Sequence, residues 1–528
     1  MKRLIICLAL AAAAAACTKN ALLPWNGKSQ EEEDLAHDMI VLGEQLPDPY
    51  SVTNMSKALQ SIVPAGAGRT TLDPTDYYVR FLPKDEQQLQ ALVERGLELI
   101  DHPLDYRIVK DGDWYHDPSL PEGDITWQYA VVPVDFSFPK GIRYERLDDC
   151  FIAEHNPATK SDGIDWEAVE REAFRLTGND DMLLTKADAE GGTHKPEGRI
   201  AIMDPGFDEE PVGVKGVKVC CNAFVKFSTC FTDEEGYYKM GRSFSSNVRY
   251  RLVFQNVKGF CQGINLIIVP ASTSALGKSE STGLSIVVDN ESERKLLTRC
   301  AVNNAGYDYL ESVRDYPDAL PTPPKDLRIW NLQMWNGELP LMLHQGVLID
   351  TYEPLKSVLG EYTHLVKIFP PDVVIGCKGA ETYADIYALA LHAFAHGGHF
   401  SLSGKDWWSN YSEYAVKSLV SSAFHNIYGA RDDDGCSYCE VAENYAFYCQ
   451  SALYKRHYKE SSAIFGTSYW FSPQLLMFLD ERGLGLDKLP PLFTPEVIDM
   501  TVLHDKLLSY YPSFKGVINE AFTRYGNE

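Results

Sequence analysis

The apolar residues of this 528-residue chain follow two different periods, and each period has its own part of the sequence. Between residues 199 and 254, short apolar runs alternate with turn residues, which is typical of strands in a small β-sandwich. Residues 291–313 and several long stretches after Thr382 repeat their apolar positions at helical spacing. We therefore expect a multidomain α+β protein with a mainly helical C-terminal part.

The first 45 residues have the composition of an export segment followed by a tether. Two basic residues precede an apolar run that is too short for a permanent membrane helix, so residues 1–16 are predicted to be a signal peptide. The run ends in three alanines before Cys17, which resembles the lipobox of bacterial lipoproteins. This resemblance implies a lipid on Cys17, a lipidated tether over 17–45 and a place in the bacterial cell envelope, with the outer membrane favoured. An ordinary signal peptide with an incidental cysteine is the alternative.

Charge and cysteine content limit the partners that the chain is expected to have. A net charge of −25 repels nucleic acid and anionic lipid, so we expect no nucleic-acid partner and membrane contact through the lipid anchor only. Ten cysteines lie beyond Cys7 and Cys17, and an oxidising compartment would allow disulfides among them. Cys436 and Cys439 form a lone CxxC, for which a disulfide, a short loop or buried thiols are favoured over a metal site.

The sequence before residue 290 divides into three predicted segments. Residues 46–177 are expected to form an α+β module without chemistry of its own, and 178–198 a linker rich in Gly and charged residues. Residues 199–285 contain a Thr-Asp-x-x-Gly-x-Tyr turn in which Asp233 can bond its own backbone and Gly236 can adopt positive φ. This segment resembles the carboxypeptidase regulatory-like β-sandwich, which implies a spacer or binding module.

Two histidines four residues apart carry the strongest chemical signal. His392 and His396 lie in an Ala- and Leu-rich helix that Gly397 and Gly398 are expected to end. Residues at this spacing share a helix face, so two imidazoles can bind one zinc ion. A second helix over 440–454 carries carboxylates that could supply a third ligand. Two histidines that are merely packed in the core are the alternative.

The two helices resemble the HExxH helix and the downstream glutamate helix of gluzincin-type metallopeptidase domains, and the resemblance covers residues 290–528. It implies that His392, His396 and Glu443 are the metal ligands and that zinc is the cofactor. Ala393 departs from the pattern, because it stands where the family has the glutamate that acts as general base. His399 is the best-placed spare imidazole to replace that base.

Three functions remain open from the sequence. The favoured one is a lipid-anchored, catalytically impaired zinc-peptidase-like protein that binds a peptide or glycan without cutting it. The second is an active zinc-dependent peptidase with a non-standard base, and the third is an interaction or adhesion protein without metal. Ala393 leaves open whether the chain is an enzyme. Nothing else in the chain offers a nucleophile elbow, a phosphate loop or a dinucleotide fingerprint.

Overall fold

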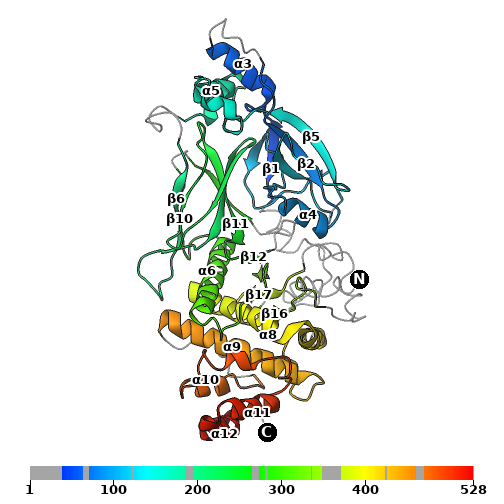
Figure 1. The fold of residues 1–528 in the computed structure, drawn as a ribbon, viewed down its shortest axis with the longest axis vertical. Helices are drawn as coiled ribbons and strands as arrows, with labels where there is room; N and C mark the ends of the chain where they lie inside the picture. The colour runs from blue at the N-terminus through cyan, green and yellow to red at the C-terminus, as the bar shows by residue number, and fades with distance from the viewer. Residues whose placement is uncertain are drawn as a thin grey trace, which may run out of the picture.

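The computed structural model describes residues 39–63, 71–121, 124–184, 194–263, 273–279, 283–333, 336–347, 370–422, 425–459 and 469–526. The predicted signal peptide, Cys17 and most of the tether lie outside the described residues, as does part of the linker. The molecule is a multidomain α+β protein with a helical C-terminal region, as the sequence predicted. Figure 1 shows an elongated arrangement in which the N-terminal module lies at one end and helices α10 to α12 at the other.

The N-terminal module combines a three-stranded antiparallel sheet in the order β4-β2-β5 with the two-stranded pair β1-β3. Buried aromatic and aliphatic side chains, including Tyr78 and Tyr129, fill the space between the strands and the helices. One of these helices is α5, whose apolar residues Val169, Ala173 and Phe174 recur at helical spacing and are buried. The elements are β1 (Val41–Gln45), α3 (Val52–Ile62), β2 (Asp76–Leu82), α4 (Glu86–Val93), β3 (Tyr106–Lys110), β4 (Gln128–Pro133), β5 (Arg143–Cys150) and α5 (Trp166–Leu176).

The middle of the chain contains strands from two sheets that share one core. One sheet has the order β10-β6-β14, with β7 paired to β6. The rings of Tyr238 and Tyr250, one from each sheet, lie 6.4 Å apart between them. Asp233 closes the predicted turn by accepting hydrogen bonds from two backbone N–H groups, and Gly236 has a φ of 82°. The strands are β6 (Glu197–Ile202), β7 (Val212–Gly213), β8 (Val217–Ala223), β9 (Lys226–Phe231), β10 (Tyr237–Lys239), β11 (Val248–Asn256), β12 (Cys261–Gln262), β13 (Thr273–Ser279) and β14 (Ile286–Val288).

The second sheet continues into the C-terminal region. Its order is β16-β17-β15-β12-β11-β8-β9, with β13 paired to β11. The junction is the parallel pairing of β12 with β15 (Arg328–Leu332), and β17 (Val373–Cys377) follows β15 in parallel. The edge strand β16 (Asn336–Pro340) runs antiparallel to β17. One sheet therefore takes strands from both sides of the predicted boundary between residues 285 and 290.

Helices pack against this sheet and against one another. α8 makes close contacts with α9, α6, β16 and β17, so it lies at the centre of the C-terminal region (Figure 1). Within the described residues no helix is long and apolar enough to cross a membrane. The helices are α6 (Arg294–Asp315), α8 (Tyr383–Ser421), α9 (Cys436–Tyr458), α10 (Gln474–Asp480), α11 (Met500–Tyr510) and α12 (Lys515–Tyr525).

The two glycines that were expected to end the histidine helix do not end it. α8 runs through Gly397 and Gly398 to Ser421, and its non-helical residue is Gly404, at φ 79°. A Cβ on Gly398 would lie 2.6 Å from the Tyr309 hydroxyl, and one on Gly397 would lie 3.1 to 3.2 Å from side chains of the segment before β15. The prediction was wrong because these glycines allow neighbouring segments to approach the helix closely, which a local sequence pattern does not reveal.

The ten cysteines of the described residues are free thiols. Cys150, Cys300, Cys377 and several others are buried, where they pack as small apolar groups. Cys436 and Cys439 lie in the first turn of α9, and Cys439 is buried. The sequence left a disulfide, a short loop or buried thiols open for this CxxC, and in the structure both residues are free thiols, one buried and one partly buried.

Candidate metal centre

Two histidines of α8 face the same point inside the C-terminal region. His392 and His396 are one helical turn apart, and the centroids of their rings are separated by 4.6 Å. Thr382 begins the helix as a capping box with Asp385, each side chain accepting a hydrogen bond from the backbone N–H of the other. The helix start is therefore fixed less than three turns before His392, and both imidazoles are buried.

Glu443 reaches the same point from α9. Its Oε2 lies 3.3 Å from Nε2 of His392, and its Oε1 lies 3.6 Å from Nε2 of His396. The Tyr411 hydroxyl donates a hydrogen bond to Oε1 of Glu443, which holds the carboxylate in place. The structure thus brings together the three residues that the sequence assigned as ligands.

A fourth group, Glu338, enters from the edge strand β16 and was not predicted. Its Oε2 lies 3.7 Å from Nε2 of His392. Ligand atoms of Glu338, His392 and His396 all lie within 4.8 Å of one another, so these buried residues could hold a metal ion. The sequence did contain one signal, because Glu338 is a lone carboxylate directly before the apolar run 339–343.

Five polar atoms of this cluster lack hydrogen-bond partners among the described residues. Both oxygens of Glu338, both ring nitrogens of His396 and Oε2 of Glu443 are buried and accept or donate no hydrogen bond. Leaving such groups unsatisfied costs roughly 1–3 kcal/mol each, and more for a charged group. A cation bound between Glu338, His392 and His396 would be bound by an oxygen of Glu338 and by one nitrogen of each imidazole. The donor set of nitrogen and oxygen atoms therefore fits a metal ion.

Charge coupling within the cluster changes the pKa of its members. Burial raises the pKa of Glu338 to about 8, and the Glu443 carboxylate adds to this rise while His392 opposes it. Burial lowers the pKa of His392, but the two carboxylates and the hydrogen bonds outweigh it and raise that pKa to about 9. The pKa of His396 falls well below its usual value through burial and the charges of the neighbouring histidines. Without a metal, the cluster therefore holds protons where the metal would bind.

Gln450 fixes the orientation of His392. Nδ1 of His392 lies 3.0 Å from Oε1 of Gln450. Gln450 follows Glu443 on the same helix, α9. With the proton on Nδ1, this contact is a hydrogen bond donated to the amide, and Nε2 is left to face Glu338 and Glu443. Gln450 is a second residue of the site that the sequence reasoning missed, because only the pairing of α8 with α9 brings it near.

Ala393 and His399 are the two other positions that the sequence analysis singled out near the metal ligands. Ala393 is fully buried and its methyl group can accept no proton. His399 does not belong to the metal group. It lies between the rings of Trp407 and Tyr445, with neither nitrogen hydrogen-bonded to a described residue, and burial lowers its pKa to about 3. Its use as a replacement base remains a prediction.

No family model, no curated protein and no solved structure matches this chain. Its function is therefore inferred from the geometry of the buried histidines and carboxylates.

Proposed function

We propose that this chain is a lipid-anchored protein of the bacterial cell envelope whose metallopeptidase-like region binds zinc, is catalytically impaired and acts by binding a peptide or glycan. The observation that carries the proposal is the buried group of Glu338, His392 and His396, whose ligand atoms all lie within 4.8 Å of one another, with Glu443 3.3 Å from Nε2 of His392. Zinc sites with a structural role have four protein ligands, whereas catalytic sites keep one position open for water or substrate.

The position of Glu338 supports a closed site. His392, His396, Glu443 and Glu338 are between 0% and 4% exposed, so little water reaches any of them. Glu338 approaches from the edge strand β16 and lies 3.7 Å from Nε2 of His392, so it could serve as a fourth protein ligand. Ala393 removes the usual proton acceptor from the same site. Both changes act against hydrolysis and neither acts against metal binding.

A second function, an active hydrolase, is favoured by one observation. Glu338 is a carboxylate inside the metal group, and a carboxylate there could take a proton from the attacking water in place of the missing glutamate. Glu338 would then be a catalytic base rather than a ligand.

Metal content tests the first part of the proposal. The chain from Thr18 onward is purified under zinc-replete conditions and analysed by mass spectrometry, together with His392→Ala and the exposed control His425→Ala. We expect about one zinc per chain in the parent and the control and none in His392→Ala. Absence of zinc from the parent would refute the zinc centre and leave the interaction protein with packed histidines.

Peptidase assays separate the two functions that include zinc. We expect no cleavage of a peptide library by the parent, with or without a chelator. Chelator-sensitive cleavage that Glu338→Gln abolishes would instead establish the hydrolase with Glu338 as base.

Screening the zinc-loaded parent against peptide and glycan arrays tests the binding role. Loss of labelled palmitate incorporation in Cys17→Ser tests the lipid anchor.

A further inference from the structure

The edge strand β16 brings Glu338 to the metal centre from a different part of the fold than the two helices. Within the described residues β16 pairs with β17 alone, because it ends the sheet. The pairing runs from Asn336 opposite Cys377 to Pro340 opposite Val373. Pro340 has no N–H to donate, which removes one hydrogen bond from a short strand. The ladder to β17 by itself therefore holds β16 weakly.

The two ends of this strand are anchored differently. Just after β16, the backbone N–H groups of Leu341 and Met342 both donate hydrogen bonds to the carbonyl of Asp372, and both side chains are buried. At the other end Asn336 is exposed, and Gly337 is half-buried with a φ of 112°. Glu338 lies between the anchored end and the exposed end, so its contacts decide whether the first half of β16 stays closed.

The carboxylate of Glu338 lacks hydrogen bonds in this position. The side chain is 4% exposed, and neither oxygen accepts a hydrogen bond from a described residue. Nε2 of His392 lies 3.7 Å from Oε2, which is beyond hydrogen-bonding distance. A buried carboxylate without a donor is costly, and it regains its hydration when the strand that carries it opens. Without a metal, Glu338 therefore favours opening of β16.

The sign reverses when the group of ligand atoms is occupied. Those of Glu338, His392 and His396 all lie within 4.8 Å of one another, so one ion can be bound by β16 and α8 together. Opening of β16 would then break the bond between the carboxylate and the ion. A ligand that binds only the closed form stabilises that form by mass action.

We propose that metal binding holds the edge strand β16 against α8, and that Glu338 is the residue that couples the metal to the strand. The inference rests on the zinc centre of the proposed function and adds a conformational role to it. The metal-free protein opens locally at β16, and the loaded protein keeps this strand closed.

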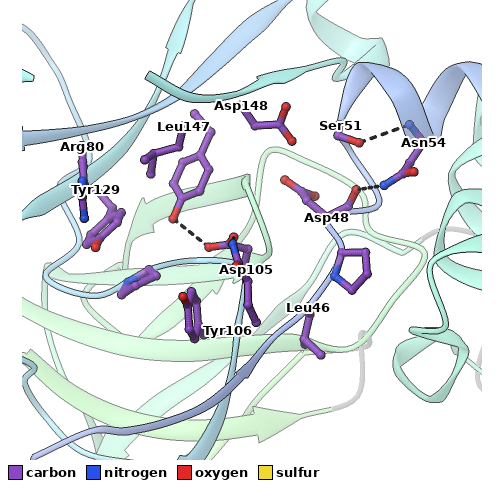
Figure 2. Close-up of a pocket in the computed structure, with 14 residues that line it drawn as sticks. Leu46, Asp48, Ser51, Asn54, Arg80, Asp105, Tyr106, Tyr129, Leu147 and Asp148 are labelled. Atoms are coloured by element: carbon purple, nitrogen blue, oxygen red, sulfur yellow. Dashed lines mark hydrogen bonds between the residues drawn. The ribbon is translucent and has the colours of Figure 1, made fainter. Parts of the chain in front are cut away.

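The N-terminal module supplies an edge strand for comparison. β5 ends the sheet β4-β2-β5 as β16 ends its own sheet. Leu147 and Asp148 of β5 line a cavity of about 560 Å³, which Figure 2 shows, and no residue of the metal centre lines it. Exchange of the β5 amides therefore reports effects of zinc on the whole molecule, whereas exchange of the β16 amides also reports the contact through Glu338.

The test is hydrogen–deuterium exchange with mass spectrometry on the chain from Thr18 onward, with and without zinc, and with the metal content of each sample measured. We expect zinc to slow exchange in residues 336–341 by about tenfold or more and in β5 by less than about twofold. Bound zinc without slowing at 336–341, or with equal slowing in β5, would overturn the inference and leave the zinc centre intact. Absence of bound zinc would overturn the proposed function and this inference with it.

Two variants and a matched control test the role of Glu338. Glu338→Gln keeps a buried polar group but loses the charged ligand, so exchange at 336–341 should be fast and change by less than about twofold with zinc. Glu338→Met has a similar size and no polar oxygen to hydrate, so exchange should be slow with and without zinc. Glu381→Gln makes the first change at an exposed carboxylate just before α8 and should keep the response of the parent.

The methionine variant also guards against a folding defect. If Glu338→Gln fails to fold by circular dichroism, Glu338→Met still tests the inference, because it removes the unsatisfied oxygens. Zinc-dependent slowing at 336–341 in Glu338→Met equal to that of the parent would overturn the inference.

Discussion

Binding of zinc to the C-terminal centre is expected to release protons. The raised pKa values of about 9 for His392 and about 8 for Glu338 favour a protonated pair in the metal-free protein at pH 7. The two groups titrate together, because the carboxylate charge of Glu338 makes the largest contribution that raises the pKa of His392, and protonation of Glu338 removes that charge. The protons held by the pair must leave before its atoms can bind a metal, so between about one and two protons are released for each zinc bound.

Calorimetry in buffers of different ionisation enthalpy measures this release directly. At pH 7 the observed enthalpy of zinc binding should change with the ionisation enthalpy of the buffer with a slope between about one and two. The apparent affinity should rise by roughly tenfold to a hundredfold from pH 6.5 to 7.5 and level off above pH 9. In Glu338→Gln the slope should fall to about one or less, because one acid is gone and His392 loses part of its stabilising charge.

The sign of the pH effect on folding follows from the same groups. Glu338 and His392 have pKa values above those of the unfolded chain, so the metal-free protein binds these protons more tightly when folded. Their contribution to stability is therefore lost as pH rises towards 9, and zinc should reverse that loss. A slope near zero in the calorimetric experiment would show that the cluster is already deprotonated, and the reasoning from burial and charge would be wrong.

Three further changes probe the scaffold of the centre. Tyr411→Phe removes the hydrogen bond to Glu443 and should weaken zinc binding by about tenfold to a hundredfold, measured by chelator competition; an unchanged affinity would show that Tyr411 does not position the ligand. Gly398→Ala should lower the free energy of unfolding by about 1–3 kcal/mol in thermal melts, whereas Gly516→Ala, with open space around its Cβ, should not lower it. Thr382→Ala removes the cap of α8 and should cost about 1 kcal/mol; no change would argue against the capping box.

The sequence predicted the parts of the centre that depend on helical period. His392 and His396 share a face because they are one turn apart, and this needs no knowledge of the fold. Glu443 required one further step, the packing of a second helix, which the resemblance to a known family supplied. Glu338 could not be found this way, because its position depends on the pairing of β16 with β17 and on the place of that edge beside α8.

Two features of the fold depend on tertiary contacts that a local sequence pattern does not show. Gly397 and Gly398 have the local signature of a helix end, but in the fold they serve the close approach of neighbouring segments. The boundary near residue 285 follows the change of hydrophobic period, but hydrogen bonds between β12 and β15 cross it. Tertiary contacts decide both features, and such contacts leave no trace in a short window of sequence.

The pairing of β12 with β15 also determines the order in which the protein can fold. During synthesis, the strands up to β12 leave the ribosome before β15 and β17 exist, so the edge of the sheet that β15 will cover stays open until then. An uncovered edge invites pairing with other chains. A fragment that stops near residue 285 would keep that edge permanently, so the middle of the chain is not expected to be recovered as a soluble unit by itself.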